Sequence, residues 1–482
     1  MQYTVSAQGQ LLPAQDGELL LDVLRRHNLA PDAPCGGHGR CGKCRVEADG
    51  RQVLACQYPI HSDCTVLLPR REEGLILTEA AGDTVPADPI GPGYSAAFDI
   101  GTTTVVCYLL APDGRELAAA SMHNPQHSYG ADVISRIQQA QKGNREALTA
   151  CIRRGMCQLL DQCCQQGGIQ PQQIGVVSVV ANPCMQQLFL GMEVDNLASV
   201  PFAPRITHSA IVPAGEYLPL CPQAQLLVVP DISGYVGADT LGCVLASRMY
   251  EGTDTVLLVD IGTNGEMLLS HQGAMVACST AAGPALEGAN IQCGMRGCTG
   301  AISHITLAGC TVIGGGPAVG ICGSGLIDAV ALMLRQGLLN KRGRVLTPDH
   351  SYALTPAVRL TQEDIRQVQM AKGAIAAGIE LMAQYMGISL SQIHRVILAG
   401  AFGTFLNPDS ACRIGLIPEV LAGKITSAGN LAGSGSKLMA KSKQQFALAQ
   451  SLRERIAFLE LASLPNFQRT FAKNMTFREE SE

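Results

Sequence analysis

The chain has 482 residues, of which 47% are hydrophobic and 16% charged, and this balance excludes an intrinsically disordered protein. Its formal net charge is −5, it contains no Trp, and aromatic residues make up 4%, so we expect neither nucleic acid nor an anionic membrane as a partner. The 19 cysteines are mostly scattered among apolar residues and the N-terminus has no signal-peptide pattern. We therefore expect a cytoplasmic protein in a reducing compartment.

The first predicted unit is a small β-rich domain over residues 1–78. Short strand candidates at 3–7 and 10–14 precede an amphipathic helix at 17–29. A glycine-rich stretch with three cysteines follows, and then a hairpin that turns at Asp49-Gly50.

The rest of the chain predicts an α/β architecture. Pro, Gly and acidic residues indicate a linker at 79–94. From 95 to 482, apolar strand segments alternate with helical segments, as in α/β domains. Because a strand followed by DIGT occurs twice, we expect two related lobes, at about 95–250 and 251–482.

Two later stretches, at 305–326 and 444–462, have distinctive patterns of apolar residues. The charge-free run at 305–326 contains seven glycines and a proline, so we expect a glycine-rich loop there rather than a membrane span. The stretch at 444–462 has the apolar spacing of an amphipathic helix.

Four cysteines of the first domain have a spacing that suits a [2Fe–2S] cluster. The spacing is C-x5-C-x2-C-x11-C, and three of the thiols lie on the loop CGGHGRCGKC. Thiolates ligate such clusters, and glycines let backbone N–H groups turn toward the sulfurs. The expected metal ligands are Cys35, Cys41, Cys44 and Cys56.

Alternatives remain for this cysteine group. A structural zinc site is the main one, although its cysteines usually come as two close pairs. Cys64 is an alternative fourth ligand, but Cys56 is preferred because it follows a strand directly. His38 is expected to be a solvent-exposed loop residue. The segment resembles plant-type and vertebrate-type ferredoxin domains, which implies a β-grasp fold, although the plant spacing has four residues in the first gap.

Two segments, FDIGTTTV and LVDIGTNGEM, each end a predicted buried strand in a turn with glycine and hydroxyl or amide side chains. Glycine lets a phosphate approach the backbone, and Thr or Asn donates to its oxygens. Asp99 and Asp260, at the strand ends, suit Mg²⁺ held through water. The expected phosphate contacts are Gly101, Thr102, Thr103, Thr104, Gly262, Thr263, Asn264 and Gly265.

Two further glycine-rich segments complete the expected nucleotide site. The string VILAGAFGTFLN predicts a strand that ends in a small-residue turn suited to an adenosine, through Gly400, Ala401, Phe402 and Gly403. The string ICGSGLIDAV leads into a helix through Gly323, Ser324 and Gly325. The N-terminus of that helix can bind an anion, or its glycines can let two helices cross closely, and both interpretations stay open.

In this order the four segments resemble those of the superfamily of acetate and sugar kinases, heat-shock chaperone ATPases and actin. The resemblance implies a two-lobed, actin-like ATPase (ASKHA) fold. A ferredoxin-type domain fused to this ATPase resembles the reductive activators of corrinoid proteins, and the strings AAGPALEGANI and TQEDIRQVQMAKGAI match as well. This resemblance covers nearly the whole chain.

The resemblance implies an ATP-hydrolysing electron-transfer activase, a corrinoid protein reductase. It would pass one electron from a [2Fe–2S] cluster to the inactive Co(II) corrinoid protein of a methyltransferase system and regenerate Co(I). ATP and Mg²⁺ are the other cofactors, and an upstream electron donor and a homodimer are expected. Asp99, Asp260 and Glu266 are the candidate catalytic residues; Glu266 either positions the attacking water or contacts backbone. Asp239 is expected to lie in the cleft between the two lobes.

Three other functions compete with this interpretation. The first is activation of another low-potential enzyme of the 2-hydroxyacyl-CoA dehydratase type, whose activators lack a ferredoxin domain. The others are a redox-regulated small-molecule kinase and an ATP-binding redox scaffold without turnover. Because so short a linker separates the two parts, we also expect the chain to lack the middle domain of better-known relatives.

Overall fold

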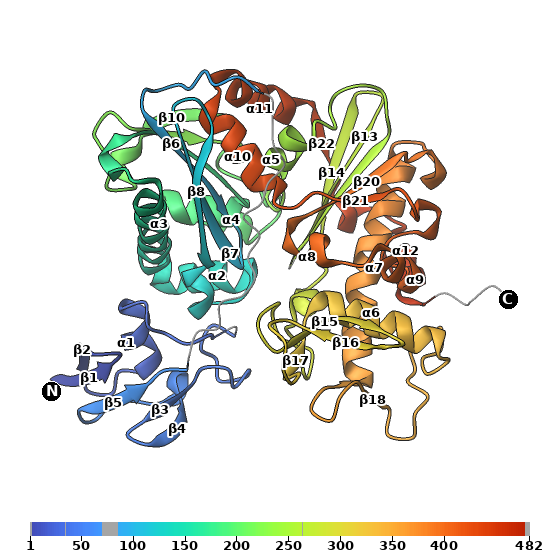
Figure 1. Cartoon of the computed structure of the whole chain (residues 1–482), viewed down its shortest axis with the longest axis horizontal. Coiled ribbons are helices and arrows are strands. Elements are labelled where there is room, and N and C mark those ends of the chain that lie inside the picture. The colour runs from blue at the N-terminus through green and yellow to red at the C-terminus, as the bar shows by residue number, and fades with distance from the viewer. Residues whose placement is uncertain (1, 34, 70–84, 263, 478–482) are drawn as a thin grey trace. The chain divides into compact units, whose positions relative to one another are not determined.

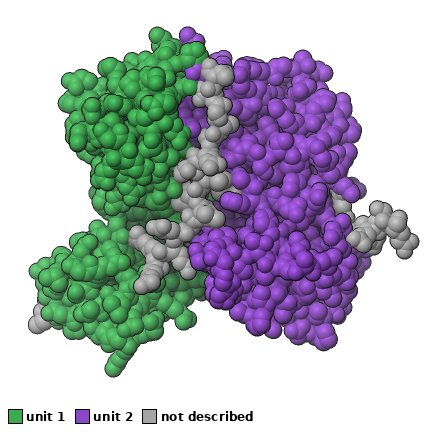
Figure 2. Space-filling view, viewed as in Figure 1, with its two compact units in different colours: residues 1–71, 86–237, 440–443 green, residues 72–85, 238–439, 444–482 purple. Residues whose placement is uncertain are grey.

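The computed structural model describes residues 2–33, 35–69, 85–262 and 264–477 (Figure 1). By its internal contacts the chain forms two compact units (Figure 2). Unit 1 comprises residues 1–71, 86–237 and 440–443, and unit 2 comprises residues 72–85, 238–439 and 444–482. Thr263 and linker residues 79–84 lie outside the described residues.

Unit 1 begins with a five-stranded sheet in the order β2-β1-β5-β3-β4, with one helix, α1, against it (Figure 1). The first two strands are antiparallel and β1 pairs with β5 in parallel, which is the mixed β-grasp pairing. The elements are β1 (Gln2–Ala7), β2 (Gln10–Gln15), α1 (Leu20–Arg26), β3 (Arg45–Ala48), β4 (Arg51–Leu54) and β5 (Cys64–Leu67).

Helix α1 is shorter than the 17–29 expected from the sequence. The Gly17 N–H donates to the Ile60 carbonyl at 2.7 Å, and the Leu20 N–H donates to the Tyr58 carbonyl at 2.9 Å. Gly17 lies in a turn with a φ of +77° and Leu19 is extended, so these bonds keep the residues before Leu20 out of the helix. Its Leu20, Leu21 and Leu24 side chains are fully buried and form the core with the sheet.

The second part of unit 1 is a six-stranded sheet in the order β10-β11-β9-β6-β7-β8. The strands β6, β7 and β8 form antiparallel hairpins, whereas β9 and β11 continue the sheet in parallel. Helix α3 packs on β7 and β8. The elements are β6 (Tyr94–Ile100), β7 (Thr104–Leu110), β8 (Glu116–His123), α2 (Val133–Gln139), α3 (Arg145–Gly167), β9 (Ile174–Ala181), α4 (Pro183–Leu190), β10 (Ala210–Pro213) and β11 (Gln225–Val228).

Unit 2 contains a second six-stranded sheet, in the order β21-β20-β12-β13-β14-β22, which is similar in its central strands but has the parallel strand β22 beyond its third antiparallel strand. Again three antiparallel strands come first in the sequence, and the first of them pairs in parallel with a later strand. The main elements are α5 (Ala238–Ser247), β12 (Val256–Ile261), β13 (Gly265–His271), β14 (Ala274–Thr280), α6 (Gly323–Arg335), α7 (Gln362–Tyr385), β20 (Arg395–Ala399), α8 (Gly400–Phe405), α9 (Pro408–Ile414), β21 (Ile425–Ser427), α10 (Leu431–Lys441), α11 (Lys443–Arg455), β22 (Ile456–Phe458) and α12 (Phe467–Met475).

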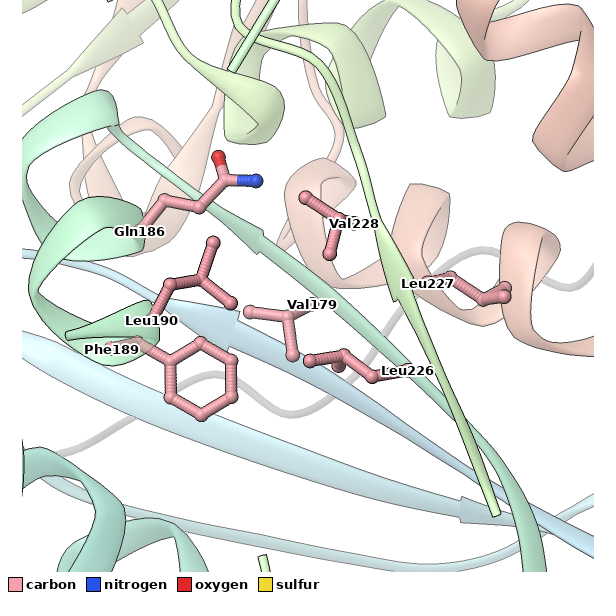
Figure 3. A pocket seen from close by; sticks show the side chains of 7 residues that line it. All are labelled: Val179, Gln186, Phe189, Leu190, Leu226, Leu227 and Val228. Carbon is pink, nitrogen blue, oxygen red and sulfur yellow. The ribbon is translucent and has the colours of Figure 1, made fainter. Parts of the chain in front are cut away.

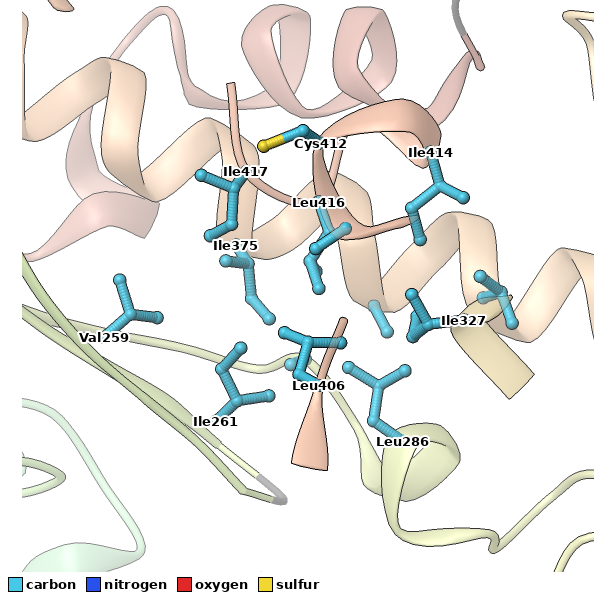
Figure 4. Close-up of a cluster of buried hydrophobic side chains, with 14 of the residues drawn as sticks. Val259, Ile261, Leu286, Ile327, Ile375, Leu406, Cys412, Ile414, Leu416 and Ile417 are labelled. Carbon is cyan, nitrogen blue, oxygen red and sulfur yellow. The ribbon is translucent and has the colours of Figure 1, made fainter. Parts of the chain in front are cut away.

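The core of unit 2 is aliphatic and is centred on α7. Figure 4 shows Ile375 of this helix among side chains from β12, α6 and α9, and beside Leu406, which follows α8. The Ile375 side chain is fully buried, as are Val259 and Ile327. Such packing holds the strand that precedes the second DIGT turn in one position.

Two segments of unit 2 contain strands where the sequence predicts a loop or a helix. The run at 305–326 is not one loop as expected: it contains β16 (Gly309–Val312) and β17 (Gly320–Ile321), which both pair with β15 (Ala301–Thr306), and the first residues of α6. Among the helices in the described part of the chain, none is both long and apolar enough to cross a membrane. The helix expected at 444–462 ends at Arg455, because the next residues form β22 and hydrogen-bond along β14.

Candidate functional site

The four expected cluster ligands come together as two pairs of thiols. The Sγ atoms of Cys35 and Cys41 are 3.3 Å apart, and those of Cys44 and Cys56 are also 3.3 Å apart. Three of the thiols lie on the loop between α1 and β3, and the fourth follows β4. Cys64 begins β5 and belongs to neither pair. Among the described residues, no three or more His, Cys, Asp or Glu side chains are grouped to hold one metal ion, so the four thiols are arranged as two pairs and not around a single ion.

The loop directs several backbone N–H groups at the sulfurs. Burial alone would raise the pKa of the Cys35 thiol, but hydrogen bonds from the Cys41 backbone and thiol and from the Arg40 and Gly37 backbones lower it to about 6. The Gly39 backbone likewise bonds to Cys56, although burial and then the Cys44 thiol raise the Cys56 pKa to about 11.

Two glycines make this loop possible. Gly37 and Gly39 have φ values of +92° and +70°, in the left-handed region that side chains rarely adopt. A Cβ on Gly39 would lie 2.4 Å from the Gln57 side-chain nitrogen. His38, between them, is exposed, as expected.

The thiols fit a [2Fe–2S] cluster, which needs two thiolates on each of two irons. Two pairs on one loop region provide that ligand set. The inward backbone N–H groups would stabilise the additional negative charge of the reduced state.

The first DIGT turn, in unit 1, joins β6 to β7. Asp99 lies at the end of β6 and is half-buried, and Thr104 begins β7. A Cβ on Gly101 would approach the Thr104 carbonyl oxygen to 3.0 Å, so the turn is tight. The Thr102 hydroxyl accepts a hydrogen bond from the Asn182 amide at 3.0 Å.

Three successive carbonyl groups of this turn accept hydrogen bonds from Asn124 and Arg136. The Asn124 side-chain amide donates to the Gly101 carbonyl at 2.8 Å, and its backbone N–H donates to the Thr103 carbonyl at 2.8 Å. Nη2 of the fully buried Arg136 donates to the Thr102 carbonyl at 2.6 Å. These hydrogen bonds fix the carbonyl groups of the turn. The turn therefore keeps one conformation, in which it can contact a phosphate.

The second DIGT turn, in unit 2, joins β12 to β13 and lies in an acidic environment. Asp260 at the end of β12 is directly opposite Glu266 of β13 in the sheet register. Burial, then the charges of Asp239 and Glu287, raise the pKa of Asp260 to about 7. Burial, then the charges of Asp239 and Asp260, raise the pKa of Glu266 well above its usual range.

Mutually repelling carboxylates of this kind are typical of a divalent-cation site. The carboxylate oxygens are hard ligands that suit Mg²⁺, directly or through water. Since no three of these described side chains are arranged to hold a metal ion directly, they fit a cation held mainly through water. The elements that supply them are α5, β12, β13 and the 3-10 turn Pro284–Glu287.

Gly400 packs directly against this acidic group. Its φ is +78°, and a Cβ there would lie 2.7 Å from Oδ1 of Asp260. Only glycine lets the chain turn from β20 into α8 beside that carboxylate. Phe402 and Gly403 follow within α8, and Phe402 packs against the aliphatic core.

The start of α6 is closely packed. A Cβ on Gly323 would lie 1.9 Å from the Leu286 carbonyl oxygen and 2.6 Å from the Phe402 ring. A Cβ on Gly325 would lie 2.3 Å from the Ile302 carbonyl oxygen. The buried Ser324 hydroxyl donates to the Ser303 carbonyl at 2.8 Å. These contacts favour the packing interpretation of this segment over anion binding.

A small hollow between α4 and the strands β9 and β11 lies in the core of unit 1. Figure 3 shows its lining of apolar side chains, with Gln186 as the exception. The Gln186 amide donates to the Val229 carbonyl at 2.7 Å, so it joins α4 to the residue that follows β11.

Three protein-family models match consecutive parts of the chain. A model described as the 2Fe-2S iron-sulfur cluster binding domain matches residues 3–61. A model described as the RACo middle region matches residues 94–252, and the model of the C-terminal, ASKHA domain of RACo matches residues 254–482.

Similar proteins include a solved structure and two curated relatives. The structure, of a reductive activator for the corrinoid, iron-sulfur protein, is 25% identical with a TM-score of 0.75, and 99% of each chain is covered. The corrinoid activation enzyme RamQ of Eubacterium limosum is 30% identical over 95% of this chain and 96% of its own. This chain belongs to the RACo family of reductive activators of corrinoid proteins. The [Co(II) methylated amine-specific corrinoid protein] reductase of Methanosarcina barkeri is 26% identical over 70% of this activator and 68% of its own chain.

The family match confirms the ferredoxin-type domain and the ASKHA fold of this activator. One expectation was wrong. The short linker suggested that the chain lacks a middle domain, yet residues 94–252 match the family's middle region. That region is the six-stranded sheet of unit 1 with its helices. It carries the first DIGT turn, and this pattern by itself predicts that the region belongs to the ATPase part.

The residues that donate hydrogen bonds to the first DIGT turn were not expected from the sequence. Asn124, Asn182 and Arg136 are distant from the DIGT string along the chain. Both asparagines precede a proline and accept a hydrogen bond from a backbone N–H at a helix start. Asn-Pro after a strand is a signal of a helix start, and it could have identified both. No local signal marks Arg136.

Proposed function

We propose that this activator transfers one electron from a [2Fe–2S] cluster to a Co(II) corrinoid protein and regenerates Co(I) for methyl transfer. The observation that carries the proposal is the pairing of thiols at Cys35/Cys41 and Cys44/Cys56, on a loop matched by the ferredoxin model, in a chain 30% identical to a corrinoid activation enzyme over nearly its whole length. The cluster, when bound, supplies the one-electron redox chemistry.

The protein's own part in this step is to hold the cluster and stabilise its reduced state. The thiol pairs set the position of the two irons. Backbone N–H groups of Gly37, Arg40 and Cys41 bond to the Cys35 sulfur, and more negative charge there strengthens such bonds. They would thereby raise the reduction potential relative to a cluster without them.

We propose that Mg²⁺-ATP binds through the two DIGT turns. Asp99 and Asp260 would organise the cation, and the phosphates would contact Gly101–Thr104 and Gly262–Gly265. Gly400, Ala401, Phe402 and Gly403 would receive the adenosine, and Gly323–Gly325 would support it from the start of α6. Support comes from the donors behind the first turn and from the carboxylates around Asp260.

Glu266 would orient the attacking water in this scheme. It lies opposite Asp260 in the sheet, and its pKa is raised by burial and by Asp239 and Asp260. A carboxyl with a raised pKa can accept a proton near neutral pH. A bound cation would lower that pKa again, so the two groups would act together.

ATP would drive the electron step through linkage. Moving one electron to a more reducing acceptor costs about 2.3 kcal/mol per 100 mV, by the charge-times-voltage relation used for membrane potentials. If nucleotide binding changes the activator's affinity for one cobalt state, the effective potential of the partner shifts by the same free energy. An upstream donor would reload the cluster. We further propose that the activator works as a homodimer in the reducing cytoplasm.

The test is anaerobic visible spectroscopy on the full chain with its cluster loaded. The mixture contains a purified Co(II) corrinoid protein, a reductant and Mg²⁺-ATP. We expect the Co(I) band to rise only when ATP is present, and to stay absent with Cys41→Ser. The control Cys64→Ser should keep both the cluster bands and the activity. Intact cluster bands with no Co(I) from any corrinoid protein tested would reject the proposed acceptor.

A further inference from the structure

One segment of unit 1 contacts both the first DIGT turn and the cluster domain. We call residues 124–139 the bridging segment; it consists of a 3-10 turn (Pro125–Ser128), a short connection and α2 (Val133–Gln139). Both of the structures it contacts belong to unit 1. Neither the DIGT pattern nor the cysteine spacing requires this segment.

On one side the bridging segment holds the turn. Asn124, its first residue, bonds to the Gly101 and Thr103 carbonyls. Arg136 of α2 bonds to the Thr102 carbonyl between them. Both side chains are fully buried, so these bonds do not compete with water.

On the other side it holds the cluster domain. Nε2 of Gln139 donates to the carbonyl of Gly36, next to the ligand Cys35, at 3.0 Å. Nε2 of His127 lies 2.5 Å from Oδ1 of Asp32. Nε of Arg25, from α1, donates to the Ser128 carbonyl at 2.9 Å.

The packing of the cluster loop on this surface is close. The Arg25 guanidinium lies over the Tyr129 ring, 4.7 Å from its centroid. A Cβ on Gly36 would lie 2.9 Å from the Tyr129 carbonyl oxygen and 3.0 Å from Nε2 of Gln139. Arg25, His127 and Gln139 are each more than 90% buried. The cluster domain therefore has a built docking surface.

The two sides of the bridging segment are joined by short, fixed connections. Arg136 and Gln139 are three residues apart on α2, and the helix start is fixed by a capping box between Asp132 and Ser135. Nδ1 of His127 is 2.7 Å from the Asn124 carbonyl oxygen. A shift of the turn carbonyls therefore moves groups that contact the cluster domain.

We propose that the bridging segment couples nucleotide binding at the first DIGT turn to docking of the cluster domain. This inference rests on the proposed nucleotide site. A nucleotide that orders the turn also orders Asn124 and Arg136, and the cluster domain then docks on an already ordered surface. By linkage the docked cluster domain strengthens nucleotide binding by the same factor. Gln139 is a positioning residue in this scheme.

The experiment measures nucleotide affinity on the full, cluster-loaded chain, with a non-hydrolysable ATP analogue and Mg²⁺ as the probe. Gln139→Glu replaces the donor to Gly36 with an acceptor of the same shape. We expect its affinity to fall about 3- to 10-fold, the range that one lost buried hydrogen bond predicts. The matched control Gln162→Glu, on the exposed surface of α3, should not change the affinity.

A second variant excludes a purely local effect on α2. Asp32→Asn lies in the cluster domain, in a side chain that is 55% exposed, and leaves α2 and the turn unaltered. It should weaken nucleotide binding about 2- to 5-fold through the lost charged bond to His127. Hydrogen exchange gives an independent readout: the nucleotide should slow exchange of the amides at 36–44 in the wild type and not in Gln139→Glu.

The possible outcomes separate the coupling from the nucleotide site. Wild-type affinity in both Gln139→Glu and Asp32→Asn overturns the coupling while the nucleotide site stands. An equal loss in Gln162→Glu also overturns it. If the wild type binds no nucleotide, the proposed nucleotide site itself fails and the coupling fails with it.

Discussion

The two DIGT turns occupy the same place in two similar sheets, yet their surroundings are opposite in charge. The turn in unit 1 is held from behind by amide and guanidinium donors, from Asn124, Asn182 and Arg136. The turn in unit 2 lies among carboxylates, with Glu266 opposite Asp260 and with Asp239 and Glu287 near. A repeated motif therefore provides a supported phosphate loop on one side and a cation site on the other.

The largest expected effect tests the acidic turn. Asp260→Asn should lower corrinoid-stimulated ATP hydrolysis about 1,000-fold, because a cation ligand contributes several kcal/mol to the transition state. Asp99→Asn, in the turn with neutral and basic neighbours, should lower it about 10- to 100-fold. Steady-state phosphate release at saturating Mg²⁺-ATP measures both. Equal losses of ATP hydrolysis in the two variants would contradict the different roles assigned to the two turns.

The next effect concerns the donors behind the first turn. Arg136→Met leaves the half-buried Thr102 carbonyl and the buried Gly130 carbonyl without their donor, and each such loss costs about 1–3 kcal/mol. We expect the free energy of unfolding to fall by about 2–4 kcal/mol. Denaturant unfolding of the nucleotide-free chain measures it. The control Arg115→Met, at a side chain that is 70% exposed, should change it by less than about 0.5 kcal/mol.

A smaller effect depends on pH. The Asp260 pKa is raised from 3.8 to about 7 in the folded chain, so the folded state binds this proton more tightly than the unfolded state. Stability should therefore fall as pH rises through this window when no cation is bound. At pH about 8, Asp260→Asn should stabilise the metal-free chain by about 1–2 kcal/mol; the effect is smaller than the full pKa shift implies because the residue is only half-buried.

Thermal unfolding in chelator at two pH values checks this prediction. At pH about 5 the stabilisation by Asp260→Asn should be smaller, since the carboxyl is then already protonated in the folded state. Added Mg²⁺ at pH about 8 should stabilise the wild type more than the variant. A variant that is less stable than the wild type at both pH values contradicts the acidic-group interpretation.

The smallest effect separates backbone strain from contact with the acidic turn. Gly400 and Gly387 have similar φ values, +78° and +68°, so replacement by Ala should cost about 1 kcal/mol of stability at each. Only at Gly400 does the new Cβ meet Asp260 Oδ1, whereas the space at Gly387 is open. Mg²⁺-nucleotide affinity should thus fall about 3-fold in Gly400→Ala alone. Titration calorimetry measures the nucleotide affinity of both variants. An equal loss of affinity in Gly400→Ala and Gly387→Ala would show that strain is the only cause.

Most of the fold could be predicted because its signals are local. The cysteine spacing, the glycine turns and the strands before each DIGT string are all readable within short windows, and the family models match the same regions. The length of α1 and the end of α11 could not be predicted. In both cases hydrogen bonds to distant strands override the helical pattern.

The sequence alone determined the ligand types and the turns, since thiols, carboxylates and glycines act through their own chemistry wherever the chain places them. Only the tertiary structure decided how the thiols pair, what surrounds each turn, and that Arg136 and Gln139 contact the turn and the cluster loop from one short helix. Such contacts join residues about 30 to more than 100 positions apart. They depend on how the sheets and helices pack, and no local pattern encodes that.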